Sequence, residues 1–323
     1  MFYTLCIALC FAVMFLMLAA SVSASVLLAR FLSRMLRNTS PATSAGILFC
    51  FRMSPLALSA VVSFGLVLPA FLKFEPAATG EMVSGHLLAL AALGLAALLM
   101  VVIRIAGMLR TTAALEREWI RHGALLDVAR LPVPVYCVSE ATSLLATTGF
   151  VRPKVFVSRD ILEALDRDEL AAALAHELAH LRALDTLKQL LLRSTQLPLR
   201  TWRRMDADWS STSEMAADEG AVRQGASALE LSSALIKVGR LSAERSVFSR
   251  FAASHLVPGG CQRTTRTRVI HLAAMLESEA SPEPGSAPSG AMAAIVLMSI
   301  IAYAAAIATL LPSIHEFLEF LVR

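Results

Sequence analysis

The segment His176-Glu-Leu-Ala-His180 has the residue types and the spacing of a metal site. On a helix, residues i and i+4 lie on one face, so both imidazoles can bind a single Zn²⁺ ion. Glu177 lies about 100° round the helix from His176, close enough to act on a zinc-activated water without binding the metal. A carboxylate in that place is a candidate general base. The alternative is a solvated helix face, which the neighbouring Ala and Leu residues disfavour.

Zinc peptidases with a His-Glu-x-x-His motif need a third ligand, and the segment 213–219 supplies acidic candidates. Glu214 is the preferred ligand, because it would complete a His₂Glu site with a fourth position left for water. Asp218 shares its helical face and is expected to accept the N–H of a ligand histidine, which fixes the tautomer. Glu219 is an alternative ligand. Without the upstream motif, the favoured interpretation of Glu214 and Asp218 would be two exposed acidic residues on a helix.

Four further residues are weaker candidates for roles near the metal. Asp185 follows His180 by five residues and is expected either to orient a ligand histidine or to cap a turn. An oxyanion formed during hydrolysis would need a donor, and three side chains are suitable for this: Tyr136, His255 and Arg268. For each of these three, packing or surface exposure is the favoured alternative.

A small β-sheet is expected before the motif. Residues 133–138 and 154–157 are short runs rich in β-branched side chains, and residues 143–149 form another candidate strand that ends in a turn. Residues 104–130 are expected to be helical until Pro132 ends the helix. These patterns predict a sheet of about three strands.

The motif itself is expected in a capped helix. Asp166 and Glu169 have the spacing of a capping box, so a helix should begin there. It should run through residues 170–184 and end before Pro198. Further helices are predicted at 212–224, 228–241 and 264–278.

The composition predicts a membrane part and a water-facing part. The chain has 323 residues, of which 56% are apolar and 17% charged, and its mean hydropathy is +0.64. A soluble domain has fewer apolar and more charged residues. The net charge is +4, but arginines flank apolar segments instead of clustering on one helix face, so anionic lipid explains them better than nucleic acid. The five cysteines form no Cys-x-x-Cys pair, which argues against a cysteine-rich zinc site or a disulfide framework.

Four segments are long enough to cross a bilayer, which requires roughly 20 apolar residues. The first could instead be a cleaved signal peptide, but it lacks a basic start and is longer than such apolar cores. The expected organisation places three spans within residues 1–103 (2–28, 53–72 and 82–103), a zinc peptidase domain at 104–278, a linker at 279–290, a fourth span at 291–311 and a tail at 312–323.

The loop charges predict an orientation. Residues 29–52 contain four arginines and no acid, whereas the loop between the second and third spans has a charge of −1. Because positive loops stay inside, residues 29–52 and the zinc domain are expected in the cytoplasm, with both termini outside.

The segments Gly149–Leu162 and Asp168–Asp185 resemble membrane peptidases of the BlaR/MecR antirepressor type, gluzincins related to the Ste24/HtpX peptidases. The Glu-x-x-x-Asp element of that family matches Glu214-Met-Ala-Ala-Asp218. The resemblance covers about residues 1–311 and implies one Zn²⁺ ion, a bacterial inner-membrane location and proteolysis of a cytoplasmic repressor or membrane protein. The antirepressors carry a penicillin-binding sensor after the last span. Only residues 312–323 follow it here, so β-lactam sensing is not implied.

The sequence therefore predicts a mainly α protein with four transmembrane helices and a cytoplasmic α+β zincin-like domain. Its expected activity is that of a zinc endopeptidase, and an extended peptide substrate would pair with the sheet edge at Ser143–Thr148. The alternative is a non-catalytic zinc-containing receptor or scaffold, which would have no use for Glu177. A transporter is disfavoured because the spans hold almost no internal charge. The oligomeric state is not indicated.

Overall fold

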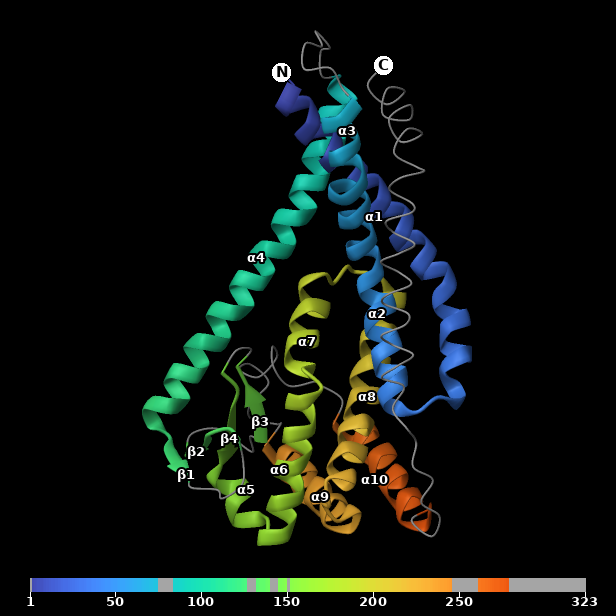
Figure 1. Cartoon of the computed structure of the whole chain (residues 1–323). Helices are drawn as coiled ribbons and strands as arrows, with labels where there is room; N and C mark the ends of the chain where they lie inside the picture. Colours follow the sequence, from blue (N-terminus) through green and yellow to red (C-terminus); the bar gives the residue numbers. More distant parts are fainter. Residues whose placement is uncertain are drawn as a thin grey trace. The chain divides into compact units, whose positions relative to one another are not determined.

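A computed structural model describes residues 2–74, 84–126, 132–139, 145–149, 152–245 and 261–278 (Figure 1). The described chain is mainly helical with one small sheet, which confirms the predicted fold class. Its residues form two compact units, one drawn from Met1–Leu32 and Phe51–Ile103 and the other from Ser33–Cys50 and Arg104–Pro282. The predicted linker, fourth span and tail lie outside the described residues.

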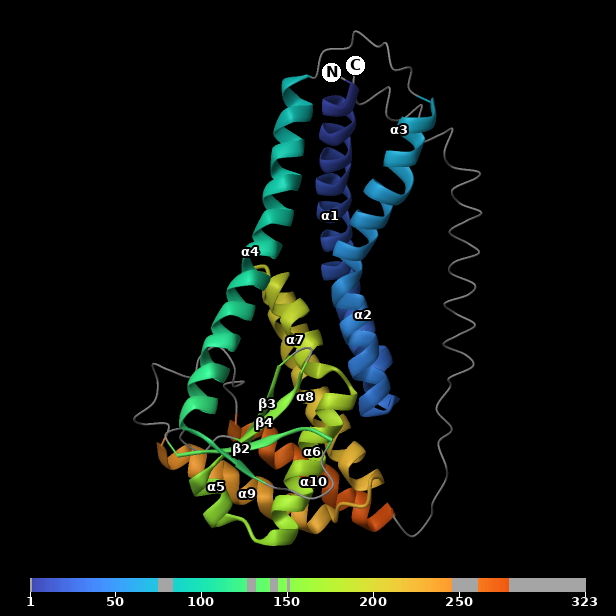
Figure 2. The same ribbon diagram turned by 60° about the vertical axis from the view of Figure 1, so that its left-hand side comes forward.

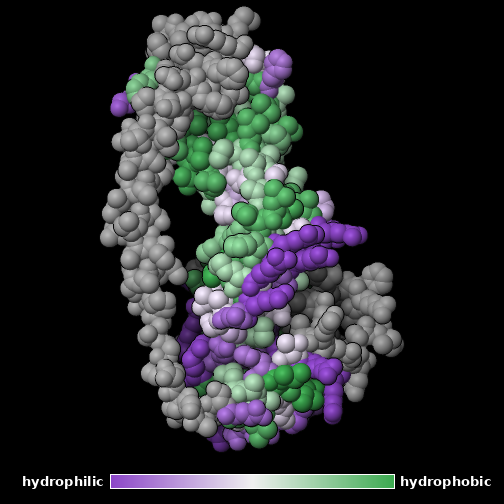
Figure 3. Space-filling view, turned by 90° about the vertical axis from the view of Figure 1, so that its right-hand side faces the viewer, coloured by the Kyte–Doolittle hydropathy of each residue, from purple (hydrophilic) through white to green (hydrophobic). Residues whose placement is uncertain are grey.

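Three helical segments are long and apolar enough to cross a membrane. They are α1 (Phe2–Met35) with the 3₁₀ turn η1 (Leu36–Asn38), α2 (Pro41–Ala60) with the π-helical η2 (Val61–Val67) and α3 (Leu68–Phe74), and α4 (Gly85–His122). On the face seen in Figure 3, hydrophobic residues gather in one part of the surface and hydrophilic residues in another. Leu27 is 80% exposed and Ile103 is 68% exposed, which suits side chains that lipid would cover.

The helices continue beyond the predicted spans. Most of the predicted loop 29–52 is helical, because nothing in its sequence stops α1 before Thr39 and Ser40. The hydroxyl of Ser40 then accepts the backbone N–H of Thr43, and Pro41 occupies a first-turn position that suits proline.

Helices α1, α3 and α4 pack together within the first unit. Leu5 and Leu9 of α1 are buried in a cluster with Phe71 of α3 and Leu87 of α4. A Cβ at Gly94 of α4 would lie 2.1 Å from the backbone oxygen of Phe11, so only glycine permits this close approach of α4 to α1.

Helix α4 ends at His122, eight residues earlier than predicted, and the next residues form an unpredicted strand. A Cβ at Gly123 would lie 2.5 Å from the backbone oxygen of Trp119, so glycine lets the chain leave the helix there. The sheet therefore has four strands, in the order β1-β2-β4-β3. Their bounds are β1 Ala124–Leu126, β2 Val135–Val138, β3 Leu145–Thr148 and β4 Lys154–Ser158.

Strand β3 is an edge strand. It pairs antiparallel with β4, which pairs parallel with β2 on its other side. Alternate side chains of a strand point to opposite faces of the sheet. On one face, Leu145, Val155 and Val157 pack with α5 (Arg159–Ala164), α6 (Arg167–Arg182) and α9 (Ala228–Arg245). Figure 2 shows these helices beside the sheet.

Helix α6 begins where predicted. Asp166 is its N-cap, and the carboxylate of Glu169 accepts the N–H of Asp166 to complete the capping box. Glu169 is buried and also accepts hydrogen bonds of 2.5 Å from Ser233 and from Lys237 of α9. These bonds hold the start of α6 against α9, and they compensate a buried carboxylate that would be costly alone.

The helices after α6 differ from the prediction in their bounds. Helix α6 ends at Arg182 because Leu184 adopts a left-handed conformation (φ 56°). The remaining helices are α7 Asp185–Ser194, α8 Arg200–Arg223, α9 Ala228–Arg245 and α10 Cys261–Ser278. Helix α8 starts twelve residues earlier than expected, because Trp202 and Trp209 extend its buried face upstream.

Candidate metal centre

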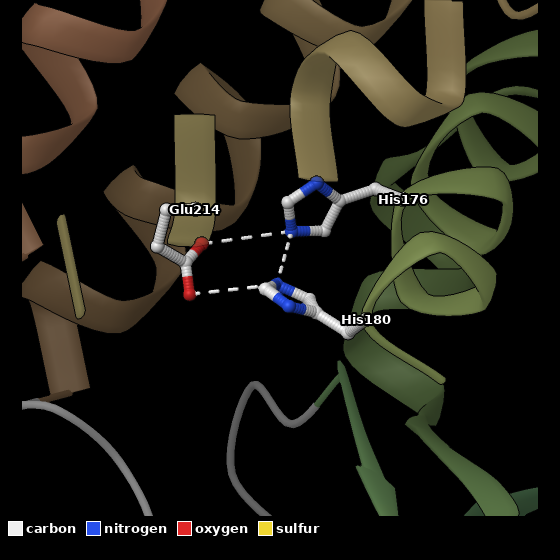
Figure 4. Close-up of side chains that lie close together, drawn as sticks. All are labelled: His176, His180 and Glu214. Atoms are coloured by element: carbon white, nitrogen blue, oxygen red, sulfur yellow. Dashed lines mark hydrogen bonds and ion pairs between the residues drawn. The ribbon is translucent and has the colours of Figure 1, made fainter. Parts of the chain in front are cut away.

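Helix α6 brings His176 and His180 together, and α8 brings Glu214 to both of them (Figure 4). The two Nε2 atoms are 3.1 Å apart. One carboxylate oxygen of Glu214 lies 3.5 Å from Nε2 of His176, and the other lies 3.6 Å from Nε2 of His180. The three predicted ligands therefore meet on facing helices of one unit.

This triangle of donor atoms has the dimensions of a zinc site. Ligand atoms about 2.0–2.1 Å from a tetrahedral zinc ion lie roughly 3.4 Å from one another. The distances of 3.1, 3.5 and 3.6 Å bracket that value. Two imidazoles and one carboxylate are the donor set of catalytic zinc sites, in which a fourth position stays open. The residues present thus fit zinc.

Each histidine is held by a carboxylate on its far nitrogen. Nδ1 of His176 lies 2.9 Å from Asp218, and Nδ1 of His180 lies 2.8 Å from Asp185. An N–H at Nδ1 donated to a carboxylate leaves the Nε2 lone pair free for a metal. The arrangement around Asp218 is the predicted one. Of the two roles expected for Asp185, its contact with His180 matches the orienting one, and Asp185 is also the first residue of α7.

Arg268 of α10 binds two acidic residues of α8, Glu214 and Asp218. Its Nη1 lies 2.8 Å from Glu214, and its Nε and Nη2 donate to the two oxygens of Asp218 at 2.8 and 2.7 Å. Arg268 was a weak candidate for the oxyanion donor, with packing or surface exposure as the favoured alternative. In the structure its side chain is 12% exposed and binds Glu214 and Asp218, the partner of His176, so most of its donors are already used.

Glu177 lies beside the triangle and does not belong to it. Its Oε2 accepts a hydrogen bond of 2.7 Å from the hydroxyl of Thr147, on the edge strand β3. Thr147 was not among the predicted site residues. The one sequence feature that pointed to this residue was its place in the candidate edge strand. Two adjacent threonines do not indicate which hydroxyl will face a helix thirty residues away.

Two of the remaining candidates, Tyr136 and Glu219, are not brought to the histidine pair. Tyr136 stacks on Phe156 with ring centroids 5.5 Å apart, on the sheet face opposite the one that packs against α6. Glu219, the alternative ligand, lies 3.1 Å from His271 and 3.4 Å from Arg223. His255 lies outside the described residues.

The charges of the cluster favour metal binding with release of a proton. Burial alone would raise the pKa of Glu214, but hydrogen bonds from His176 and His180 and the charge of Arg268 hold it well below its usual range. Burial likewise opposes the charged form of His180, but Asp185 and Glu214 raise the pKa of this imidazole to about 10. The acid is thus ready to act as a ligand at neutral pH, whereas a proton competes with the metal at His180.

The donor set and a match to a family model together support one class, the zincin-type metallopeptidases. Residues 110–207 match the family model of Peptidase family M48, whose members are zinc-dependent. The matched segment includes the His-Glu-x-x-His motif of α6 and ends before Glu214. Comparison with curated proteins and with solved structures gave no match.

Proposed function

We propose that the chain is an integral membrane zinc endopeptidase, with His176, His180 and Glu214 as zinc ligands and Glu177 as the general base. The observation that carries this proposal is the triangle of three donor atoms, 3.1 to 3.6 Å apart, with a carboxylate beside it. The match to Peptidase family M48 and the apolar helices support the same class and its association with a bilayer.

The residues around the triangle have separate tasks in peptide hydrolysis. Zinc in such a site supplies Lewis-acid chemistry, which polarises the scissile carbonyl and lowers the pKa of water. Glu177 accepts a proton from the attacking water and returns it to the leaving amine. Asp218 and Asp185 keep the imidazoles in the correct tautomer, and Arg268 fixes the ligand carboxylate.

Strand β3 offers a place for the substrate. Among the described residues it pairs with β4 alone, so its other edge can receive an extended peptide through backbone hydrogen bonds. The hydrogen bond from Thr147 shows that this strand lies directly beside Glu177. A peptide added to β3 would therefore run past the general base.

Zinc removal should abolish cleavage, and added zinc should restore it. The purified full chain in detergent is treated with 1,10-phenanthroline and then with one equivalent of Zn²⁺, and cleavage of an internally quenched peptide is followed. Because the raised pKa of His180 means that zinc displaces a proton near neutral pH, the apparent zinc affinity should weaken by up to about tenfold for each unit of falling pH. Cleavage that survives complete removal of zinc would refute the proposal.

We further propose regulatory proteolysis of a cytoplasmic repressor or a membrane protein, with the zinc domain in the cytoplasm of a bacterial cell. The resemblance to BlaR/MecR-type peptidases and the four arginines of residues 29–52 support this. Alkaline phosphatase, which needs an oxidising compartment, should be active when fused after residue 78 and inactive when fused after residue 40 or 278. The reverse pattern would invert the proposed orientation.

A further inference from the structure

The hydroxyl of Thr147 lies 2.7 Å from Oε2 of Glu177 and donates to it. Both side chains are half-buried, so the contact is partly shielded from water. Thr147 comes from the edge of the sheet and Glu177 from the helix that carries the histidine pair. The bond therefore joins the proposed general base to the proposed substrate strand.

The geometry of β3 explains how the hydroxyl is aimed. Leu145 and Thr147 are two residues apart and lie on the same face of the strand. Leu145 packs into the core cluster with residues of α6, which anchors that face of β3 against the helix. Thr148 points to the opposite face, and its buried hydroxyl has no hydrogen-bond partner among the described residues. Thr147 and Thr148 therefore lie on opposite faces of β3, and the hydroxyl of Thr147 is the one that bonds Glu177.

We propose that Thr147 is a positioning residue for the general base, an inference that rests on the proposed function. A glutamate has several rotatable bonds, so its carboxylate needs a partner to stay in one orientation. With Oε2 held in this way, Oε1 can accept the proton of a reacting water, and correct orientation of a catalytic group contributes strongly to rate. Thr147 also lies on the strand with which an extended peptide would pair. Binding of the substrate and orientation of the general base therefore both involve this residue.

The test uses three variants of the full chain in detergent, each loaded with one equivalent of Zn²⁺ and assayed on an internally quenched peptide. Thr147→Val keeps the size and β-branching of the side chain but lacks the hydroxyl, and it should lower kcat about 10- to 100-fold, the range seen for residues that orient a metal site. KM and zinc content should stay unchanged. Thr147→Ser, which restores the hydroxyl, and Thr148→Val, the matched control, should both stay within about threefold of the wild-type kcat.

The outcomes separate this inference from the proposed function. Wild-type cleavage together with an unaffected Thr147→Val kcat would overturn the role of Thr147 alone. A Thr147→Val variant that loses zinc, or that changes only KM, would also overturn it, because the residue would then act on the fold or on the substrate. If Thr147→Val does not fold, the pair Thr147→Ala and Thr147→Ser makes the same comparison, since these two differ only in the hydroxyl. A zinc-loaded wild type that cleaves no peptide would refute the peptidase itself, and this inference with it.

Discussion

Replacing Glu177 with alanine should abolish detectable peptide cleavage and leave one zinc ion per chain. The carboxylate of Glu177 is bound by Thr147 and lies outside the triangle of donor atoms, so its loss removes no ligand. A positioned general base contributes about 10²- to 10⁴-fold to rate, and kcat should fall by at least that much. Steady-state kinetics on an internally quenched peptide and metal analysis of the same preparation would measure both quantities.

Two variants sharpen this test of Glu177. Glu177→Gln keeps the shape of the side chain and an acceptor for Thr147, so it should also be inactive if proton transfer is the function lost. Glu219→Ala removes an acidic residue of α8 that contacts His271 and Arg223, and it should keep both zinc and activity. Full activity of Glu177→Ala would end the proposed mechanism. Such a result would favour another base, or a zinc centre with a structural role.

The second large effect is expected from Glu214→Ala, which should lose zinc and activity together. The variant removes one of three protein donors, and it also leaves the positive charge of Arg268 partly uncompensated near the imidazoles. Nη2 of Arg268 lies 3.3 Å from Nε2 of His176, so this cation would then oppose a Zn²⁺ ion directly. We expect zinc affinity to fall more than about 100-fold, beyond the usual effect of an outer residue. Competition with a fluorescent zinc chelator would measure this affinity.

Glu219→Ala is again the matched control, because Glu219 was the alternative ligand and belongs to the same helix. Zinc loss in Glu219→Ala with normal binding in Glu214→Ala would exchange their roles and contradict the observed triangle. Thermal unfolding of both variants in the zinc-free state would show whether either substitution disturbs α8 itself. A Glu214→Ala chain that is folded and still holds zinc at wild-type affinity would refute the ligand assignment.

The spacing of residues along the chain was sufficient to predict the residues at the core of the site. The two histidines share a face of α6 because they are four residues apart, and Asp166 caps this helix because its partner Glu169 is three residues away. Glu214 could be chosen because a third ligand was required and an acid recurs with Asp218 at helical spacing. Long apolar runs likewise predicted the helices of the first unit, although not their ends.

Other features depended on contacts that local patterns do not contain. The sequence predicted a helix up to residue 130, but residues 124–126 pair with β2 and form the strand β1. It also placed the start of α8 twelve residues too late, because burial of Trp202 and Trp209 depends on neighbours far away in the chain. Tertiary packing prevails over local propensity in such cases.

By itself, the sequence predicted the three residues of the donor triangle, the helix that carries the histidine pair and the long apolar helices, since each follows from residue type and periodicity within a few turns. Only the tertiary structure decided which hydroxyl holds Glu177 and what Arg268 contacts. These bonds join residues 30 and 50 positions apart. The physical reason is that such contacts depend on how a strand edge and three helices pack, and packing is a property of the whole unit.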